Sequence, residues 1–63
     1  MPIIRVEMFK GRSREQKREL VKALTDAMVK TTGAKPEACW VVISDVEKED
    51  WGFGGELGCD KYP

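Results

Sequence analysis

The 63-residue sequence contains no histidine, so the side chain that most often exchanges protons near neutral pH is absent. Among the remaining groups, a terminal amine has the ordinary pKa nearest to 7, with cysteine next, whereas lysines and carboxylates need large pKa shifts to titrate there. Initiator methionine is normally removed when a small residue follows it, and the second residue here is Pro2. Proton-transfer chemistry in this chain therefore points to the secondary amine of Pro2.

Cysteine is scarce, and Cys39 and Cys59 can form one disulfide at most. Neither cysteine lies in a Cys-x-x-Cys or Cys/His pattern, so we expect two reduced thiols rather than a disulfide framework. Without histidine to activate a thiol, we do not expect either cysteine to act as a nucleophile. The same scarcity of ligands predicts no metal site, and nothing in the sequence calls for a cofactor.

Long apolar runs and signal peptides are also missing, which predicts a soluble, cytoplasmic protein with no membrane partner. Eleven basic and eleven acidic side chains cancel and are interspersed, so nucleic acid is not an expected partner. Residues 47–63 contain several glycines, but a phosphate-binding loop needs a helix after it, and we expect none there.

The pattern of apolar residues predicts a strand, a helix and a second strand. Residues 3–9 alternate between two faces, and Ser13 with Gln16 forms a capping box that begins a helix running from residue 14 to about residue 32. Gly33 is suited to ending that helix. Residues 38–46 are rich in β-branched side chains and predict the second strand.

Two strands joined through a helix run parallel in one sheet, so we predict an α+β fold with a single β-α-β domain over residues 1–63 and a short C-terminal hairpin or arm. The helix covers one sheet face. The other face carries Ile3, Phe9 and either Trp40 or its neighbours, and we expect no remaining element to cover it. A chain this small hides only roughly 60% of its unfolded surface, so another subunit is expected there.

Three residues are candidates for chemistry or binding. Burial and nearby cations would disfavour the protonated form of the Pro2 amine, although a proline can also simply begin an edge strand. Arg12, just before the helix cap, can bind a carboxylate through two parallel hydrogen bonds, or it can be a solvated turn residue. Trp51 is suited either to walling a pocket or to anchoring a neighbouring subunit.

The opening proline, the "KGRS" turn, the "EQK" helix start and the "WGFGGE" tail occur in an order and spacing that resemble the 4-oxalocrotonate tautomerase family. The resemblance runs from Pro2 to about Leu57. It implies a subunit that pairs into a four-stranded dimer sheet and assembles as a homohexamer, a trimer of dimers. It also implies a cofactor-free isomerase that acts on a small enol or keto acid.

The resemblance assigns roles to particular residues. It implies that Pro2 is the general base that moves a proton between oxygen and carbon of an enol or dienol acid, and that Arg12 binds the substrate carboxylate. Trp51 takes the place of the family's phenylalanine, which walls the pocket and lowers its dielectric constant.

One position departs from the family pattern. Trp40 stands where studied members carry a second arginine, which binds the substrate and polarises its keto oxygen. Loss of such a donor typically costs on the order of 10² or more in rate, which disfavours the usual dicarboxylate dienol. We expect Trp40 instead to offer a flat apolar surface to a monoacid or a more aromatic enol.

Two alternative functions remain open. A protonated Pro2 would act as a general acid in the hydration or decarboxylation of small unsaturated acids. A chain that keeps the fold but lacks the second cation would serve as a non-catalytic oligomeric binding module.

Overall fold

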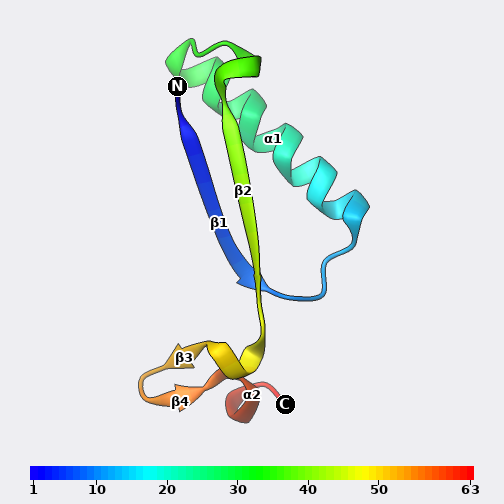
Figure 1. Ribbon diagram of the computed structural model, residues 1–63, viewed down its shortest axis with the longest axis vertical. Coiled ribbons are helices and arrows are strands. Elements are labelled where there is room, and N and C mark those ends of the chain that lie inside the picture. The colour runs from blue at the N-terminus through cyan, green and yellow to red at the C-terminus, as the bar shows by residue number, and fades with distance from the viewer.

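The computed structural model describes residues 1–63, and its main elements follow the predicted order (Figure 1). Strand β1 (Ile3–Phe9) leads into helix α1 (Arg14–Thr32), and strand β2 (Trp40–Val46) returns beside β1. The chain then forms the two-stranded hairpin of β3 (Gly52–Phe53) and β4 (Glu56–Leu57) and ends in helix α2 (Gly58–Lys61). The α+β class, the parallel pair and the C-terminal hairpin are therefore confirmed.

Local signals set both ends of α1. The Ser13 hydroxyl accepts a hydrogen bond from the Gln16 N–H at 3.1 Å, and the Gln16 side-chain oxygen accepts one from the Ser13 N–H at 2.9 Å. This reciprocal pair is the predicted capping box. At the other end, Gly33 adopts a left-handed conformation with φ of 75° and donates its N–H to the Val29 carbonyl. Glycine adopts that conformation without a steric penalty, so the helix ends there.

Strand β2 begins at Trp40, two positions later than the predicted start at residue 38. Residues Pro36–Ala38 form a 3-10 turn instead, in which the Ala38 N–H donates to the Lys35 carbonyl at 2.9 Å. Proline favours this arrangement because its ring fixes φ near the helical value and its missing N–H is not needed in a first turn.

Strands β1 and β2 pair in parallel, with Ile3 beside Trp40 and Phe9 beside Val46. The alternation of side chains gives the two-stranded sheet two different faces. The inner face lies against α1 and carries half-buried apolar side chains from both strands, Ile4, Val6, Met8, Val41 and Ile43. The outer face is exposed over most of its length, at Ile3, Arg5, Glu7, Trp40, Val42 and Ser44.

The Phe9 end of the outer face is covered, contrary to the expectation that only another subunit would reach it. The Phe9 ring packs edge-to-face against the rings of Trp51, Phe53 and Tyr62, with centroid distances of 4.8, 6.1 and 6.4 Å. These four residues form what we call the aromatic cluster. The cluster holds the C-terminal segment against the end of the sheet, far from the N-terminus (Figure 1).

The expectation that no helix follows the glycines is wrong, because α2 occupies Gly58–Lys61. Two backbone hydrogen bonds hold this single turn, from the Gly58 N–H to the Trp51 carbonyl at 2.6 Å and from the Tyr62 N–H to the Gly58 carbonyl at 2.8 Å. Lys48 also donates from Nζ to the Tyr62 carbonyl at 2.8 Å. The turn is thus fixed by contacts with the preceding loop.

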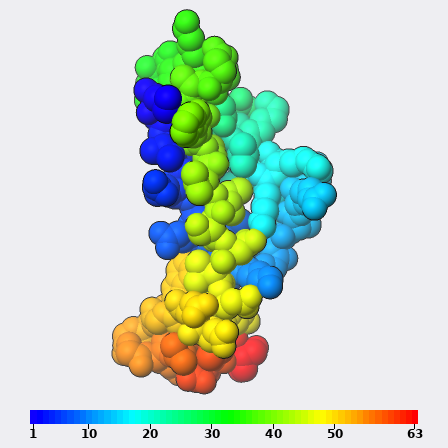
Figure 2. Space-filling model, in the orientation of Figure 1, coloured from blue at the N-terminus to red at the C-terminus, as the bar shows by residue number.

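The molecule is elongated, measuring 42 × 24 × 14 Å, with the C-terminal segment extending beyond the sheet (Figure 2). Gly58 is the one residue of the 63 that is fully buried. Neither helix is long and apolar enough to cross a membrane. A single chain therefore leaves most of its apolar side chains only partly covered.

Replacing Gly58 with alanine should lower stability, because the added Cβ would lie 2.8 Å from the Lys48 carbonyl oxygen, a backbone atom with little freedom to move. We expect the free energy of unfolding to fall by about 1–3 kcal/mol, as for overpacking. The control is Gly52→Ala, whose Cβ would meet its nearest neighbour at 3.9 Å. Urea unfolding at one protomer concentration checks this, and equal effects at the two positions would contradict it.

Candidate active site

Pro2 and Trp40 lie together at one end of the sheet. The Pro2 carbonyl accepts a hydrogen bond from the Trp40 N–H at 3.0 Å, which fixes the start of β1 against the start of β2. Pro2 is half-buried, whereas the Trp40 side chain is 52% exposed on the outer face. Met1 is 84% exposed. Because a peptide bond joins it to Pro2, the nitrogen of Pro2 becomes a free amine only when Met1 is removed.

Arg12 and Trp51 lie at the other end of the sheet, where β1 and β2 finish. Arg12 lies in the turn between β1 and α1, and Trp51 lies just beyond β2, where it packs on Phe9. Strand β1 has seven residues, and at about 3.3 Å per residue it separates these two ends by roughly 20 Å. The four candidate residues are therefore divided between two ends of one chain, and a single subunit does not bring them into one pocket.

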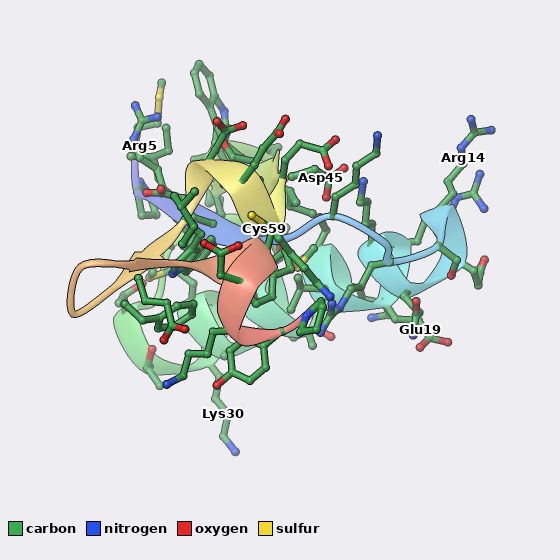
Figure 3. All side chains as sticks on the ribbon, turned by 90° about the horizontal axis from the view of Figure 1, so that it is seen from below. Arg5, Arg14, Glu19, Lys30, Asp45 and Cys59 are labelled. Carbon is green, nitrogen blue, oxygen red and sulfur yellow. The ribbon has the colours of Figure 1, made fainter.

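The cationic side chains near these residues differ in whether they already pair with a carboxylate. Arg12 is exposed and takes no part in the chain's ion pairs, so its guanidinium is available to a ligand. Lys10 pairs with Glu47 at 3.1 Å. Arg5 also lies outside the ion pairs and projects from β1 away from α1 (Figure 3).

A recess of about 260 Å³ lies beside Trp51 on the outer face. Its lining residues are Glu7, Val46, Asp50, Trp51 and Gly52. Two of these side chains are carboxylates and none is cationic, so the recess by itself repels an acidic ligand. An acid-binding site must therefore draw its cation from elsewhere, and the exposed Arg12, in the turn that follows β1, is one cation toward this end that takes part in no ion pair.

A second hollow, of about 380 Å³, lies on the surface of α1 and is lined by Arg14, Lys17, Arg18, Val21 and Lys22. Three of its four cations already face carboxylates, in the pairs Lys17–Asp45, Arg18–Glu15 and Lys22–Asp26. Arg14 lies at the start of α1, well apart from Arg5 (Figure 3). The hollow contains none of the predicted site residues.

Sequence reasoning missed that Phe9 packs against Trp51 and that Tyr62 packs against Phe9 and Phe53. Trp51 and Phe53 stack with an interplanar angle of 20°, and Tyr62 closes the aromatic cluster from the C-terminal end. Their separation along the chain gives no periodic signal, because the contacts form only when the hairpin folds back on β1. Cys39 and Cys59 are free and half-buried.

Comparison with known proteins identifies the family. The sequence profile described as "Tautomerase enzyme" matches residues 2–60, which is nearly the whole chain. The chain belongs to the tautomerase family. A probable tautomerase from Staphylococcus epidermidis is 49% identical over 61 residues, covering 97% of this chain and all of the relative.

Solved structures of 4-oxalocrotonate tautomerases agree with this fold. An isozyme from Methylibium petroleiphilum is 37% identical and superposes with a TM-score of 0.91 over 98% of this chain and 100% of the other. A heterohexameric 4-oxalocrotonate tautomerase from Chloroflexus aurantiacus is 32% identical, with a TM-score of 0.89 over 95% and 97% of the two chains. The resemblance in the sequence is thus confirmed, and this tautomerase falls among the isomerases.

Proposed function

We propose that this tautomerase interconverts the enol and keto forms of an unsaturated 2-oxo acid, without a cofactor, using the amine of Pro2 as general base once Met1 is removed. The observation that carries the proposal is the position of Pro2: it is half-buried at the start of β1, beside Trp40, in a chain that matches the tautomerase family from this residue onward. The absence of histidine leaves no competing base of ordinary pKa near 7.

The proposed reaction moves one proton and needs no redox step. The neutral amine of Pro2 takes the proton from the enol hydroxyl, the oxygen becomes the keto carbonyl, and the electron pair of the double bond moves to carbon. The protonated amine then returns the proton to that carbon. Arg12 binds the substrate carboxylate through its two-pronged guanidinium and so holds the reacting atoms near Pro2.

This arrangement requires more than one subunit, because β1 separates Pro2 from Arg12 and Trp51. We propose that Pro2 of one chain meets Arg12 and Trp51 of another within a homohexamer. The exposure of the single chain supports assembly, since Gly58 is its one buried residue and no apolar side chain is buried. The heterohexameric structural relative supports the stoichiometry.

We further propose that Trp40 selects the substrate class. Together with Ile3 and Val42, which are 47% and 39% exposed, Trp40 forms an apolar patch on the outer face at the Pro2 end. The three side chains of this patch carry no charge, and the nearest cation in the strand register is Arg5, which lies beside Val42 on the outer face. The patch suits an enol acid with one carboxylate, bound by Arg12, and an apolar or aromatic tail that lies on the indole.

Blocking the amine of Pro2 should abolish catalysis. We expect a synthetic chain that begins at an N-acetylated Pro2 to lose about 10² to 10⁴ in kcat on 2-hydroxy dienoic and arylenol acids, because general acid–base catalysis supplies that much. The control is the same synthetic chain with a free amine, and both should assemble equally by size-exclusion chromatography. Full activity in the acetylated chain would disprove the role of Pro2. In the free chain, kcat/KM that falls rather than rises as the amine loses its proton would support the general-acid alternative.

Mixing two inactive variants should restore activity if the site is shared between chains. An N-acetylated chain retains Arg12, and an Arg12→Ala chain retains the free Pro2 amine. Mixed assemblies, refolded together from denaturant, should therefore contain sites with both groups. We expect activity well above the sum of the separate variants, as measured by ketonisation rates. No gain in assemblies shown to be mixed by mass spectrometry would place both groups of a site in one chain.

Replacing Trp40 with arginine should shift specificity toward dicarboxylates. The new guanidinium would bind a second carboxylate and stabilise charge on the keto oxygen, so we expect kcat/KM for a dicarboxylate dienol to rise about 10-fold or more relative to that for an arylenol monoacid. Trp40→Ala is the control, because it removes the indole without adding charge. An unchanged ratio in Trp40→Arg would show that this position lies outside the site.

A further inference from the structure

Backbone and ring contacts together fix Trp51. Its N–H donates to the Lys48 carbonyl at 3.4 Å, and its carbonyl accepts a hydrogen bond from the Gly58 N–H at 2.6 Å. Its indole meets the Phe9 ring edge-to-face at a centroid distance of 4.8 Å and stacks with Phe53 at 6.3 Å. The two phenylalanine rings therefore determine the plane of the indole.

Tyr62 packs against both of these phenylalanine rings. It meets Phe9 at a centroid distance of 6.4 Å and Phe53 at 5.7 Å, edge-to-face in both cases, with interplanar angles of 63° and 83°. Aromatic pairs of this geometry each change an equilibrium constant by about 2- to 10-fold. Tyr62 thus stabilises the positions of the two rings that contact the indole of Trp51.

The backbone provides a second connection between Tyr62 and Trp51, through the same two residues. Lys48 accepts the Trp51 N–H with its carbonyl and donates from Nζ to the Tyr62 carbonyl at 2.8 Å. Gly58 donates its N–H to the Trp51 carbonyl and accepts the Tyr62 N–H at 2.8 Å. Displacement of Tyr62 would therefore disturb the contacts of Trp51 by two routes.

Helix α2 has little stability of its own, because nucleating a helix costs more than a single turn of hydrogen bonds returns. The contacts of Tyr62 with Lys48 and with the phenylalanine rings hold this turn in place. We call α2 together with Tyr62 the C-terminal latch. In this arrangement the latch and the indole of Trp51 stabilise each other, since an energetic coupling between two sites is reciprocal.

We propose that Tyr62 is a positioning residue for Trp51, and that the C-terminal latch makes the indole a rigid wall that favours flat, conjugated substrate tails over bulky saturated ones. This inference rests on the proposed function, in which Trp51 of one chain meets Pro2 and Trp40 of another. A substrate tail in that site has the exposed indole of Trp40 on one side and the fixed indole of Trp51 on the other. A wall that cannot rotate accepts a flat ring and disfavours a thicker one, because close-packed surroundings tolerate little added volume.

The contacts of Tyr62 involve its ring and its backbone rather than its hydroxyl. Tyr62→Phe therefore keeps them all, whereas Tyr62→Ala removes the ring and keeps the backbone groups. Lys48→Met removes the hydrogen bond from Nζ to the Tyr62 carbonyl and keeps most of the length of the side chain. These three variants separate the effect of the ring from that of the backbone connection.

Kinetics with two matched monoacids test the effect on specificity. We expect the parent to prefer an enol acid with a phenyl tail to the same acid with a cyclohexyl tail. Tyr62→Ala should reduce the ratio of the two kcat/KM values by about 3-fold or more, mainly through KM, because Pro2 and Arg12 are unchanged. Tyr62→Phe is the control and should keep the parental ratio. An unchanged ratio in Tyr62→Ala, or an equal loss on both substrates, would overturn the proposal.

Fluorescence tests the positioning of Trp51 without turnover. The chain has two tryptophans, so Trp51 is the one that remains in a Trp40→Phe background. There, Tyr62→Ala should shift the emission to longer wavelength and increase quenching by acrylamide, and Lys48→Met should shift both in the same direction by less. Tyr62→Phe should leave both unchanged, and analytical ultracentrifugation at one protomer concentration checks that the variants assemble alike.

Unchanged emission and quenching in Tyr62→Ala would show that the ring does not hold Trp51 and would overturn the proposal. If Tyr62→Ala does not assemble, Lys48→Met decides the question by the same two measurements, and parental values in it would equally exclude the latch. Neither measurement needs a substrate. Failure of the latch is therefore distinguishable from failure of Pro2 as the base, which the acetylated chain tests.

Discussion

The parallel pairing of β1 with β2 is the constraint on which the rest of the structure depends. The α1 crossover makes both strands run in one direction, so Ile3 lies beside Trp40 and Phe9 beside Val46. Residues that precede the strands therefore gather at one end, and residues that follow them gather at the other. Pro2 and Arg12 are close in sequence, yet the length of β1 keeps them at opposite ends. In the proposed assembly, one subunit therefore contributes residues to two different sites.

The outer face of the sheet divides into three zones with different chemistry. Apolar side chains dominate at the Trp40 end, the charges of Arg5 and Glu7 lie in the middle, and the aromatic cluster covers the Phe9 end. We connect the apolar zone with substrate selection and the aromatic cluster with closure of the C-terminal segment. In an assembly, the exposed apolar side chains of this face could be buried between subunits, and such burial is the main favourable term in most protein association.

The chemistry proposed for this tautomerase uses few groups. The chain has no histidine, and the recess on its outer face carries carboxylates rather than cations. We therefore propose Arg12 as the group that binds the acid and the amine of Pro2 as the group that carries the proton. In the proposed site, exclusion of water by Trp40 and Trp51 would matter, because a low dielectric constant strengthens the few electrostatic interactions present.

Local sequence patterns were enough to predict the first strand, the limits of α1 with its capping box, the parallel pair and the family, since these depend on periodicity, caps and motif spacing. It also pointed to Pro2 through the absence of any histidine. The packing of Trp51, Phe53 and Tyr62 over Phe9, and the helical turn that begins at Gly58, became visible in the folded chain alone. Those contacts join residues that are far apart along the chain, and no local pattern encodes where a flexible glycine-rich segment folds back.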